Sequence, residues 1–214
     1  MLVDLKFDGK YVVVVGGGSE SYRKALDFLE AGAKILVASK SFSSEIKQLQ
    51  EQGRIMLQQA DIEDAKKFLE FLEPKPDLLL AITNDRVLNS QLIRLSKSAG
   101  CMVYAPDDPS ISDFALPAVA KVGDVRIAIS TSGKSPVMAS ALRKRVEKII
   151  KPEDLLQIKL QEYMRGILKE RVSDQKSRRK LLYSILQSEE VQKLLKQGNF
   201  DEAKEKAMEI IQKS

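Results

Sequence analysis

Short apolar runs alternate with amphipathic stretches through the first half of the chain. Five runs have the length and composition of strands, and the most apolar of them suit burial on both faces of a sheet: 11–15, 34–38, 54–58, 78–83 and 101–105. Apolar residues recur at helical spacing between these runs, over 22–29, 44–52, 65–72 and 88–95. Strands and helices in alternation predict an α/β fold, with a parallel sheet and right-handed crossover connections.

The pattern changes after residue 106. Two runs of β-type residues within 116–130, joined by a Gly-Asp pair, predict a hairpin outside the parallel sheet, with apolar residues on both faces. Ser135 and Pro136 are the residue types that favour an N-cap and the first helical position, so a helix is expected to follow. The remaining 64 residues, 151–214, have no strand signal. Ser173 and Ser188 are the predicted N-caps of two helices in this segment.

A glycine turn stands between the first strand and the first helix. Gly16 permits a tight turn, and Gly18 lets the backbone approach a pyrophosphate, which the N–H groups at the helix start would face. Ser21 occupies the place of a third glycine and is small enough to keep helix and strand close. This order predicts a Rossmann-type nucleotide site, although a purely structural turn is the alternative. The residues assigned to cofactor binding are Gly16, Gly17, Gly18, Ser19, Glu20 and Ser21.

Two further strand ends belong to the predicted cofactor site. The second strand is followed by Ser39 and Lys40, without the carboxylate that usually holds the ribose hydroxyls of NAD. Lys40 could attract a 2′-phosphate, so NADP stays open beside NAD, and a solvated loop lysine is the plainer interpretation. Thr83, Asn84 and Asp85 lie at the carboxyl end of another apolar strand, where open α/β sheets bind ligands.

Composition and charge narrow the chemistry. The chain has 214 residues, a net charge of +5 and no histidine, which removes the commonest metal ligand and acid–base catalyst. We therefore expect no metal site. The positive charge is too diffuse to predict a nucleic-acid partner, and no apolar run is long enough for a membrane span. Cys101 is the only cysteine, which excludes an internal disulfide and predicts a cytoplasmic protein.

A second candidate anion site precedes the predicted helix at Pro136. The sequence Thr-Ser-Gly-Lys-Ser brings hydroxyl groups, a glycine and a lysine to a helix start. A capped helix without a ligand explains the same residues equally well, and both interpretations stay open.

Four segments together carry a family resemblance. VVVVGGGSESYRK, AITND, YAPDDPSISDFALPA and AISTSGKSPVMASALRKRVE occur in the order and spacing of the precorrin-2 dehydrogenase family, the dehydrogenase module of siroheme synthases. The resemblance covers about residues 5–150. It implies NAD-dependent oxidation of precorrin-2 to sirohydrochlorin, an essential aspartate that falls on Asp107, and a homodimer built around the hairpin region. Some members also insert ferrous iron, and the sequence leaves that activity open.

The chain departs from the family pattern at two places. The usual Gly-Gly-Gly-x-Val-Ala is Gly-Gly-Gly-Ser-Glu-Ser, and Tyr104 replaces an asparagine before the essential aspartate. The residue chemistry still agrees with the implied reaction, because without histidine a carboxylate such as Asp107 is the available base. A tetrapyrrole rich in carboxylates would be attracted by basic and hydroxyl groups, for which the candidates are Arg126, Ser132, Lys134 and Ser135.

The predicted organisation has three parts: an NAD(P)-binding Rossmann domain over 1–113, a dimerisation region over 114–150 and a helical domain over 151–214. The alternative function is an NAD(H)-sensing regulatory module without catalysis. Asp107 discriminates between the two functions, because a sensor needs no base beside the nicotinamide.

Overall fold

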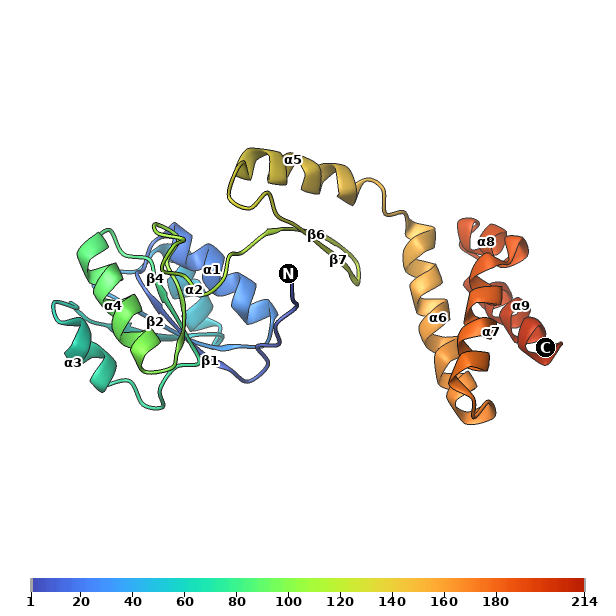
Figure 1. Ribbon diagram of the computed structural model, residues 1–214, viewed down its shortest axis with the longest axis horizontal. Coiled ribbons are helices and arrows are strands. Elements are labelled where there is room, and N and C mark those ends of the chain that lie inside the picture. The colour runs from blue at the N-terminus through green and yellow to red at the C-terminus, as the bar shows by residue number, and fades with distance from the viewer. Residues whose placement is uncertain (1, 214) are drawn as a thin grey trace. The chain divides into compact units, whose positions relative to one another are not determined.

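A computed structural model of the protein describes residues 2–213. The chain folds into two compact units, Met1–Leu116 and Pro117–Ser214 (Figure 1). None of the helices in the described part of the chain combines the length and apolar character needed to cross a bilayer.

The first unit is built on a five-stranded parallel sheet. Its strands are β1 (Tyr11–Val15), β2 (Lys34–Ser39), β3 (Met56–Gln59), β4 (Leu78–Ala81) and β5 (Met102–Tyr104). They lie in the order β3-β2-β1-β4-β5, and every neighbouring pair is parallel. The predicted Rossmann-type sheet is therefore confirmed. Because the order reverses direction at β1, the crevice between β1 and β4 is where such sheets bind ligands.

Helices cover both faces of the sheet. Their bounds are α1 (Ser19–Glu30), α2 (Ser44–Glu51), α3 (Ala65–Glu70) and α4 (Arg86–Ser98). Val12 and Val14 of β1 belong to one core cluster with α1 and α2, whereas Val13 and Val15 belong to another with α3 and α4. This alternation along one strand explains why the run of valines carries no polar residue: both faces of β1 are buried.

Strand β4 ends at Ala81, two residues earlier than the predicted strand over 78–83. The backbone N–H of Thr83 donates to the side-chain oxygen Oδ1 of Asn89, 3.1 Å away, instead of continuing the strand ladder. The chain therefore turns away at the carboxyl end of the sheet, beside the glycine loop.

The second unit begins with the predicted hairpin. Strands β6 (Ala118–Val122) and β7 (Val125–Ile129) pair in antiparallel register, and α5 (Pro136–Glu147) follows. The first strand starts two residues later than expected, after Pro117, which has no backbone N–H to donate. Ser135 caps α5 as predicted, because its hydroxyl accepts from the N–H of Met138.

Four helices complete the second unit: α6 (Pro152–Arg171), α7 (Gln175–Gln187), α8 (Glu189–Lys196) and α9 (Phe200–Gln212). Leu160, Met164 and Ile185 are fully buried in their shared core. Ser188 caps α8 as predicted. The predicted cap at Ser173 is wrong by one residue, because the carboxylate of Asp174 binds the Ser177 N–H and hydroxyl and starts α7. The separation of this unit at residue 150 stays a prediction.

Candidate active site

The glycine loop is closely packed on two sides and open on the third. A Cβ atom on Gly16 would lie 2.2 Å from the Ile82 carbonyl oxygen, and one on Gly17 would lie 1.9 Å from the Ser41 carbonyl oxygen. Neither position accepts a side chain without moving the backbone. A Cβ on Gly18, in contrast, would meet no heavy atom within 4 Å. The loop thus leaves an open cradle above Gly18, where a ligand could lie against the backbone.

The first turn of α1 faces this cradle. Gly18 is the N-cap and has no side chain with which to bind the N–H groups of the first turn. Backbone N–H groups and the helix dipole at such a terminus suit a pyrophosphate. Glu20, the acidic departure from the family pattern, forms an ion pair with Arg23, so its charge is balanced locally. The residues present therefore fit the nucleotide that the sequence predicts.

Ser21 has a different position from the rest of the loop. Its side chain is completely buried, and its hydroxyl has no hydrogen-bond partner among the described residues. A Cβ on Gly16 would lie 3.1 Å from this hydroxyl oxygen, so Ser21 packs helix against strand, as the third glycine of the motif usually does. Its backbone N–H is what it can offer a cofactor.

Lys40 is exposed at the end of β2, but it has an acidic partner. Its Nζ lies 2.7 Å from Oδ1 of Asp61, and this hydrogen bond raises the pKa of the Lys40 ammonium. Ser39 lies under the loop, with its hydroxyl 2.9 Å from the position of a Cβ on Gly17. The sequence shows no carboxylate after the second strand, and Asp61 reaches this place from the segment after β3. The parallel pairing of β2 with β3 brings their carboxyl ends together, and this could have indicated that Asp61 lies near Lys40.

The three predicted residues after β4 have separate positions. Asp85 is the N-cap of α4, where its Oδ1 accepts from the N–H groups of Val87 and Leu88. Thr83 donates its hydroxyl to Oδ1 of Asn89, 2.7 Å away. Asn84 is exposed, and its side chain makes no hydrogen bond within residues 2–213. Of the three side chains, that of Asn84 is available to a ligand.

Asp107 lies next to this strand end. Its carboxylate is exposed, and its Oδ2 accepts a hydrogen bond of 3.2 Å from Nδ2 of Asn89, the buried residue that also binds Thr83. The neighbouring carboxylate of Asp108 accepts from the N–H and hydroxyl of Ser110 and closes a turn. Of the two carboxylates, only that of Asp107 is thus hydrogen-bonded to a residue at the carboxyl edge of the sheet.

Sequence reasoning missed Asn89. A polar residue between Leu88 and Leu92, on the buried side of a helix, was the available signal.

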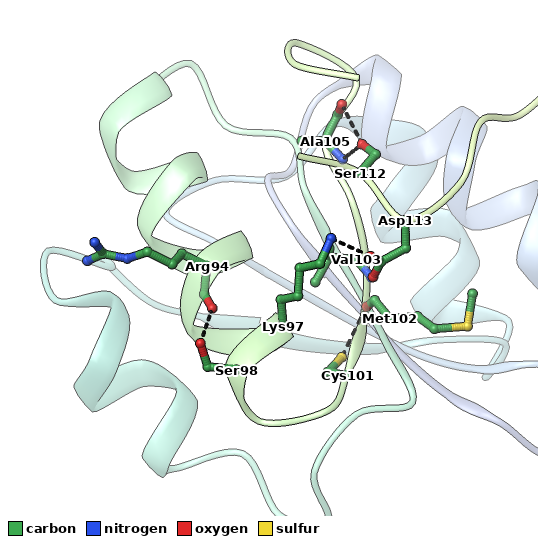
Figure 2. A network of polar contacts seen from close by, with 9 residues as sticks. All are labelled: Arg94, Lys97, Ser98, Cys101, Met102, Val103, Ala105, Ser112 and Asp113. Atoms are coloured by element: carbon green, nitrogen blue, oxygen red, sulfur yellow. Dashed lines mark hydrogen bonds and ion pairs between the residues drawn. The ribbon is translucent and has the colours of Figure 1, made fainter. Parts of the chain in front are cut away.

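Two side chains anchor the loop that carries Asp107 (Figure 2). Asp113 accepts from the N–H of Val103 through Oδ2 and pairs with Lys97 through Oδ1, at 3.0 and 2.5 Å. The Ser112 hydroxyl accepts from the N–H of Ala105, 2.8 Å away, and lies 3.1 Å from its carbonyl. The loop therefore leaves β5 and returns to it, so that both of its ends are held.

Tyr104, which replaces the family asparagine, lies on the α1 side of the sheet. Its ring stacks on Phe114, with 5.5 Å between centroids, and the Lys24 ammonium lies 5.6 Å from the ring centre. Burial, and then the negative charges of Glu20 and Asp27, raise the pKa of its hydroxyl. Tyr104 therefore packs against α1, whereas Asp107 is bound from α4.

The predicted anion loop before α5 is a tightly hydrogen-bonded turn. Thr131 Oγ1 accepts from the N–H of Ser135, and Ser132 has a φ of 53°, a left-handed conformation that costs energy for a non-glycine residue. Ser135 uses its hydroxyl as the α5 cap. Lys134 is exposed, as is Arg126 on the hairpin. The predicted substrate residues Arg126, Ser132, Lys134 and Ser135 all belong to the second unit, and their contact with a substrate stays a prediction.

Potential metal ligands and the single cysteine complete the description of residues 2–213. No group of three or more histidine, cysteine, aspartate or glutamate side chains in that range could hold a metal ion. Burial raises the pKa of the Cys101 thiol to about 11, which keeps it protonated and unreactive.

Comparisons with known proteins agree with this architecture. One family model, described as "Putative NAD(P)-binding", matches residues 3–118, and another, described as "Sirohaem biosynthesis protein central", matches residues 122–149. A solved structure of SirC, precorrin-2 dehydrogenase, superposes with a TM-score of 0.76 over 96% of this chain and 99% of that one. At 23% identity, this match shows a shared fold.

Sequence relatives are closer. The chain is 33% identical over 206 residues to the precorrin-2 dehydrogenase of Methanosarcina barkeri, covering 96% of this chain and 88% of the relative. It is 34% identical over 146 residues to the siroheme synthase of Nitrosococcus oceani, covering 68% of this chain and 30% of that larger protein. The resemblance noted in the motifs is confirmed. The chain belongs to the precorrin-2 dehydrogenase family, which includes the N-terminal module of siroheme synthases.

Proposed function

We propose that this protein oxidises precorrin-2 to sirohydrochlorin in siroheme biosynthesis, with NAD as the hydride acceptor. The observation that carries the proposal is the position of Asp107. An exposed carboxylate is held by Asn89 at the end of β4, and β4 borders the strand that leads into the glycine loop. A candidate base and a candidate pyrophosphate cradle therefore occupy the same edge of one sheet.

The reaction removes one hydride and one proton from the macrocycle. NAD, when bound at the glycine loop, supplies the acceptor for the hydride. Asp107 takes the proton. Its Oδ2 is held by Asn89, while its Oδ1 accepts no hydrogen bond from any described residue and is the oxygen that can act as the base. The anchored ends of the loop keep this carboxylate at the sheet edge.

Incubation of the purified protein with precorrin-2 and NAD tests this function directly. The expected result is formation of NADH together with the absorption spectrum of sirohydrochlorin, at a rate proportional to the protein concentration. NAD binding without any oxidation of precorrin-2 would overturn the proposal and favour the NAD(H)-sensing module instead.

Substrate recognition is assigned to the second unit as part of the same proposal. Precorrin-2 carries several carboxylates, and Arg126 and Lys134 present exposed positive charges. Ser132 has a left-handed backbone next to Gly133. The N–H groups of Ser132, Lys134 and Ser135 are bound within the turn, which leaves that of Gly133 for an anion. Ser135 supports this loop from the helix cap.

The Lys40–Asp61 ion pair favours NAD over NADP. In this fold the end of β2 holds the adenosine ribose, and Asp61 neutralises the charge that could attract a 2′-phosphate. We expect Asp61→Asn to strengthen NADP binding about three- to tenfold and to leave NAD binding nearly unchanged, since exposed pairs are worth little.

Titration of both nucleotides, followed by protein fluorescence or calorimetry, measures this change. Adding Lys40→Ala to Asp61→Asn should abolish the gain. An NADP affinity that is insensitive to both substitutions would refute the assignment.

A homodimer built around the hairpin region is the expected assembly. Only Ala120 and Ala139 are buried among residues 118–147, whereas Val137 and Met138 on α5 are 79% and 46% exposed. Apolar surface of this kind favours pairing with a second copy. Sedimentation at micromolar concentration should show a dimer, and Val137→Glu should shift it towards the monomer.

The matched control is Phe71→Glu, which changes an exposed apolar side chain outside the hairpin region and should leave the dimer intact. A wild-type monomer at micromolar concentration would rule this assembly out.

We also propose a cytoplasmic location, because the buried, unpaired Cys101 suits a reducing compartment.

A further inference from the structure

We propose that Asn89 is a positioning residue that fixes the carboxylate of Asp107 for proton transfer. This inference rests on the proposed function, because it assumes that Asp107 is the base. It adds a residue that acts through Asp107 rather than on the substrate, and it explains how an exposed side chain on a loop acquires a defined orientation.

Asn89 makes four side-chain hydrogen bonds. Its Oδ1 accepts from the backbone N–H of Thr83 at 3.1 Å and from the Thr83 hydroxyl at 2.7 Å. Its Nδ2 donates to the Thr83 carbonyl at 3.0 Å and to Oδ2 of Asp107 at 3.2 Å. Two acceptor and two donor positions are the full capacity of an amide. Asn89 is 4% exposed, so the amide itself is shielded from water although the Asp107 carboxylate is exposed.

The contacts with Thr83 fix the amide plane. Three bonds to one residue leave the group no alternative rotamer, and the second N–H of Nδ2 can then point in only one direction. That direction is occupied by Asp107, eighteen residues further along the chain. Asn89 therefore holds the Asp107 carboxylate at a fixed place relative to the end of β4.

The backbone and the side chain of Asp107 are thus held separately. Ser112 and Asp113 bind the loop to β5 beyond Asp107, and Asn89 binds the carboxylate itself (Figure 2 shows the loop anchors). Without the amide, the exposed Asp107 side chain would sample several rotamers, of which a fraction would place Oδ1 beside the substrate. A displacement of about 1 Å can lower a rate by about a hundredfold.

A merely structural role for Asn89 predicts a different result. If it only closed the Thr83 turn, its loss would disturb the cofactor site and the fold, whether or not Asp107 were present. If it acts through Asp107, its loss should matter only while position 107 carries a base. A double-mutant cycle measured on kcat separates the two cases.

The cycle uses Asn89→Ala, Asp107→Asn and the double variant, at saturating NAD and precorrin-2. We expect Asn89→Ala to lower kcat about 10- to 100-fold in the wild-type background, but less than about threefold in the Asp107→Asn background. The NAD dissociation constant should stay within about threefold of the wild type. Ser96→Ala is the matched control, since Ser96 is a buried polar residue of the same helix whose hydroxyl has no partner among the described residues.

Asn89→Asp covers the case in which Asn89→Ala fails to fold. Aspartate keeps an oxygen for the N–H and hydroxyl of Thr83, but it loses the donors to the Thr83 carbonyl and to Asp107. The fall in kcat should therefore persist, and it should again shrink below about threefold in the Asp107→Asn background. Equal losses of kcat in both backgrounds, or a wild-type kcat in Asn89→Asp, would overturn the positioning role. A wild-type rate in Asp107→Asn alone would instead overturn the base on which this inference rests.

Discussion

Asp107→Asn is expected to lower the kcat for precorrin-2 oxidation about a hundred- to ten-thousand-fold, which is the usual cost of losing a general base. The amide keeps the size and polarity of the carboxylate but cannot accept the proton. Its oxygen can still receive the hydrogen bond from Asn89, so the loop should keep its conformation. NAD affinity should be unchanged, because the glycine loop lies at the end of a different strand.

Asp108→Asn is the internal control for this substitution. The oxygen of an asparagine can replace the carboxylate oxygen that accepts from the Ser110 N–H, and the turn is expected to remain closed. Its kcat should stay close to that of the wild type. Stopped-flow measurement of NADH formation compares the two variants. If Asp107→Asn oxidises precorrin-2 at the wild-type rate, the proposed base is wrong, whatever the fold.

Gly18→Asp is expected to abolish measurable NAD binding. Gly18 has an ordinary extended conformation, with φ at −90°, and open space where a Cβ would be, so the variant should fold. Its carboxylate would occupy the cradle in front of the α1 N-terminus, against the pyrophosphate. Like charges in such contact cost several kcal/mol, which weakens binding by about a hundredfold or more.

The control for Gly18→Asp is Gly166→Asp. Gly166 also has open space around its Cβ position, but it lies on α6 in the other unit. The Gly166→Asp variant carries the same new side chain and should bind NAD as the wild type does. Calorimetric titration with NAD, together with circular dichroism to verify the fold, measures both variants. Unchanged NAD affinity in a folded Gly18→Asp protein would remove the cofactor site from this loop.

Local sequence patterns were sufficient to predict the sheet and the glycine loop. The valine run of β1 has to be apolar because both of its faces are buried, and the turn after it needs glycine because neighbouring carbonyls leave no room for a Cβ. Ser135 and Ser188 indicate where α5 and α8 begin, because their hydroxyls accept a hydrogen bond from an N–H group of the first turn. In each case the cause lies within a few residues of the pattern.

Interactions between distant segments could not be predicted in the same way. Asp61 reaches Lys40 across neighbouring strands, and Asn89 reaches Asp107 over eighteen residues. Asp85 is predicted as a cofactor ligand from its place after β4, and its use as the N-cap of α4 could not be foreseen from that place alone. An aspartate at a strand end can bind a ligand, cap a helix or pair with a lysine. Which of these it does depends on a partner residue from elsewhere in the chain.

The loop that carries Asp107 also covers one edge of the sheet, because it returns to β5. Strand β5 is the last in the order, so its outer backbone groups would otherwise be available to a strand from another molecule. Ser112 and Asp113 bind the N–H and carbonyl groups of Val103 and Ala105 on that side. The two residues that hold the Asp107 loop thereby protect the protein against edge-to-edge aggregation, and a variant that loosens the loop should aggregate sooner as well as react more slowly.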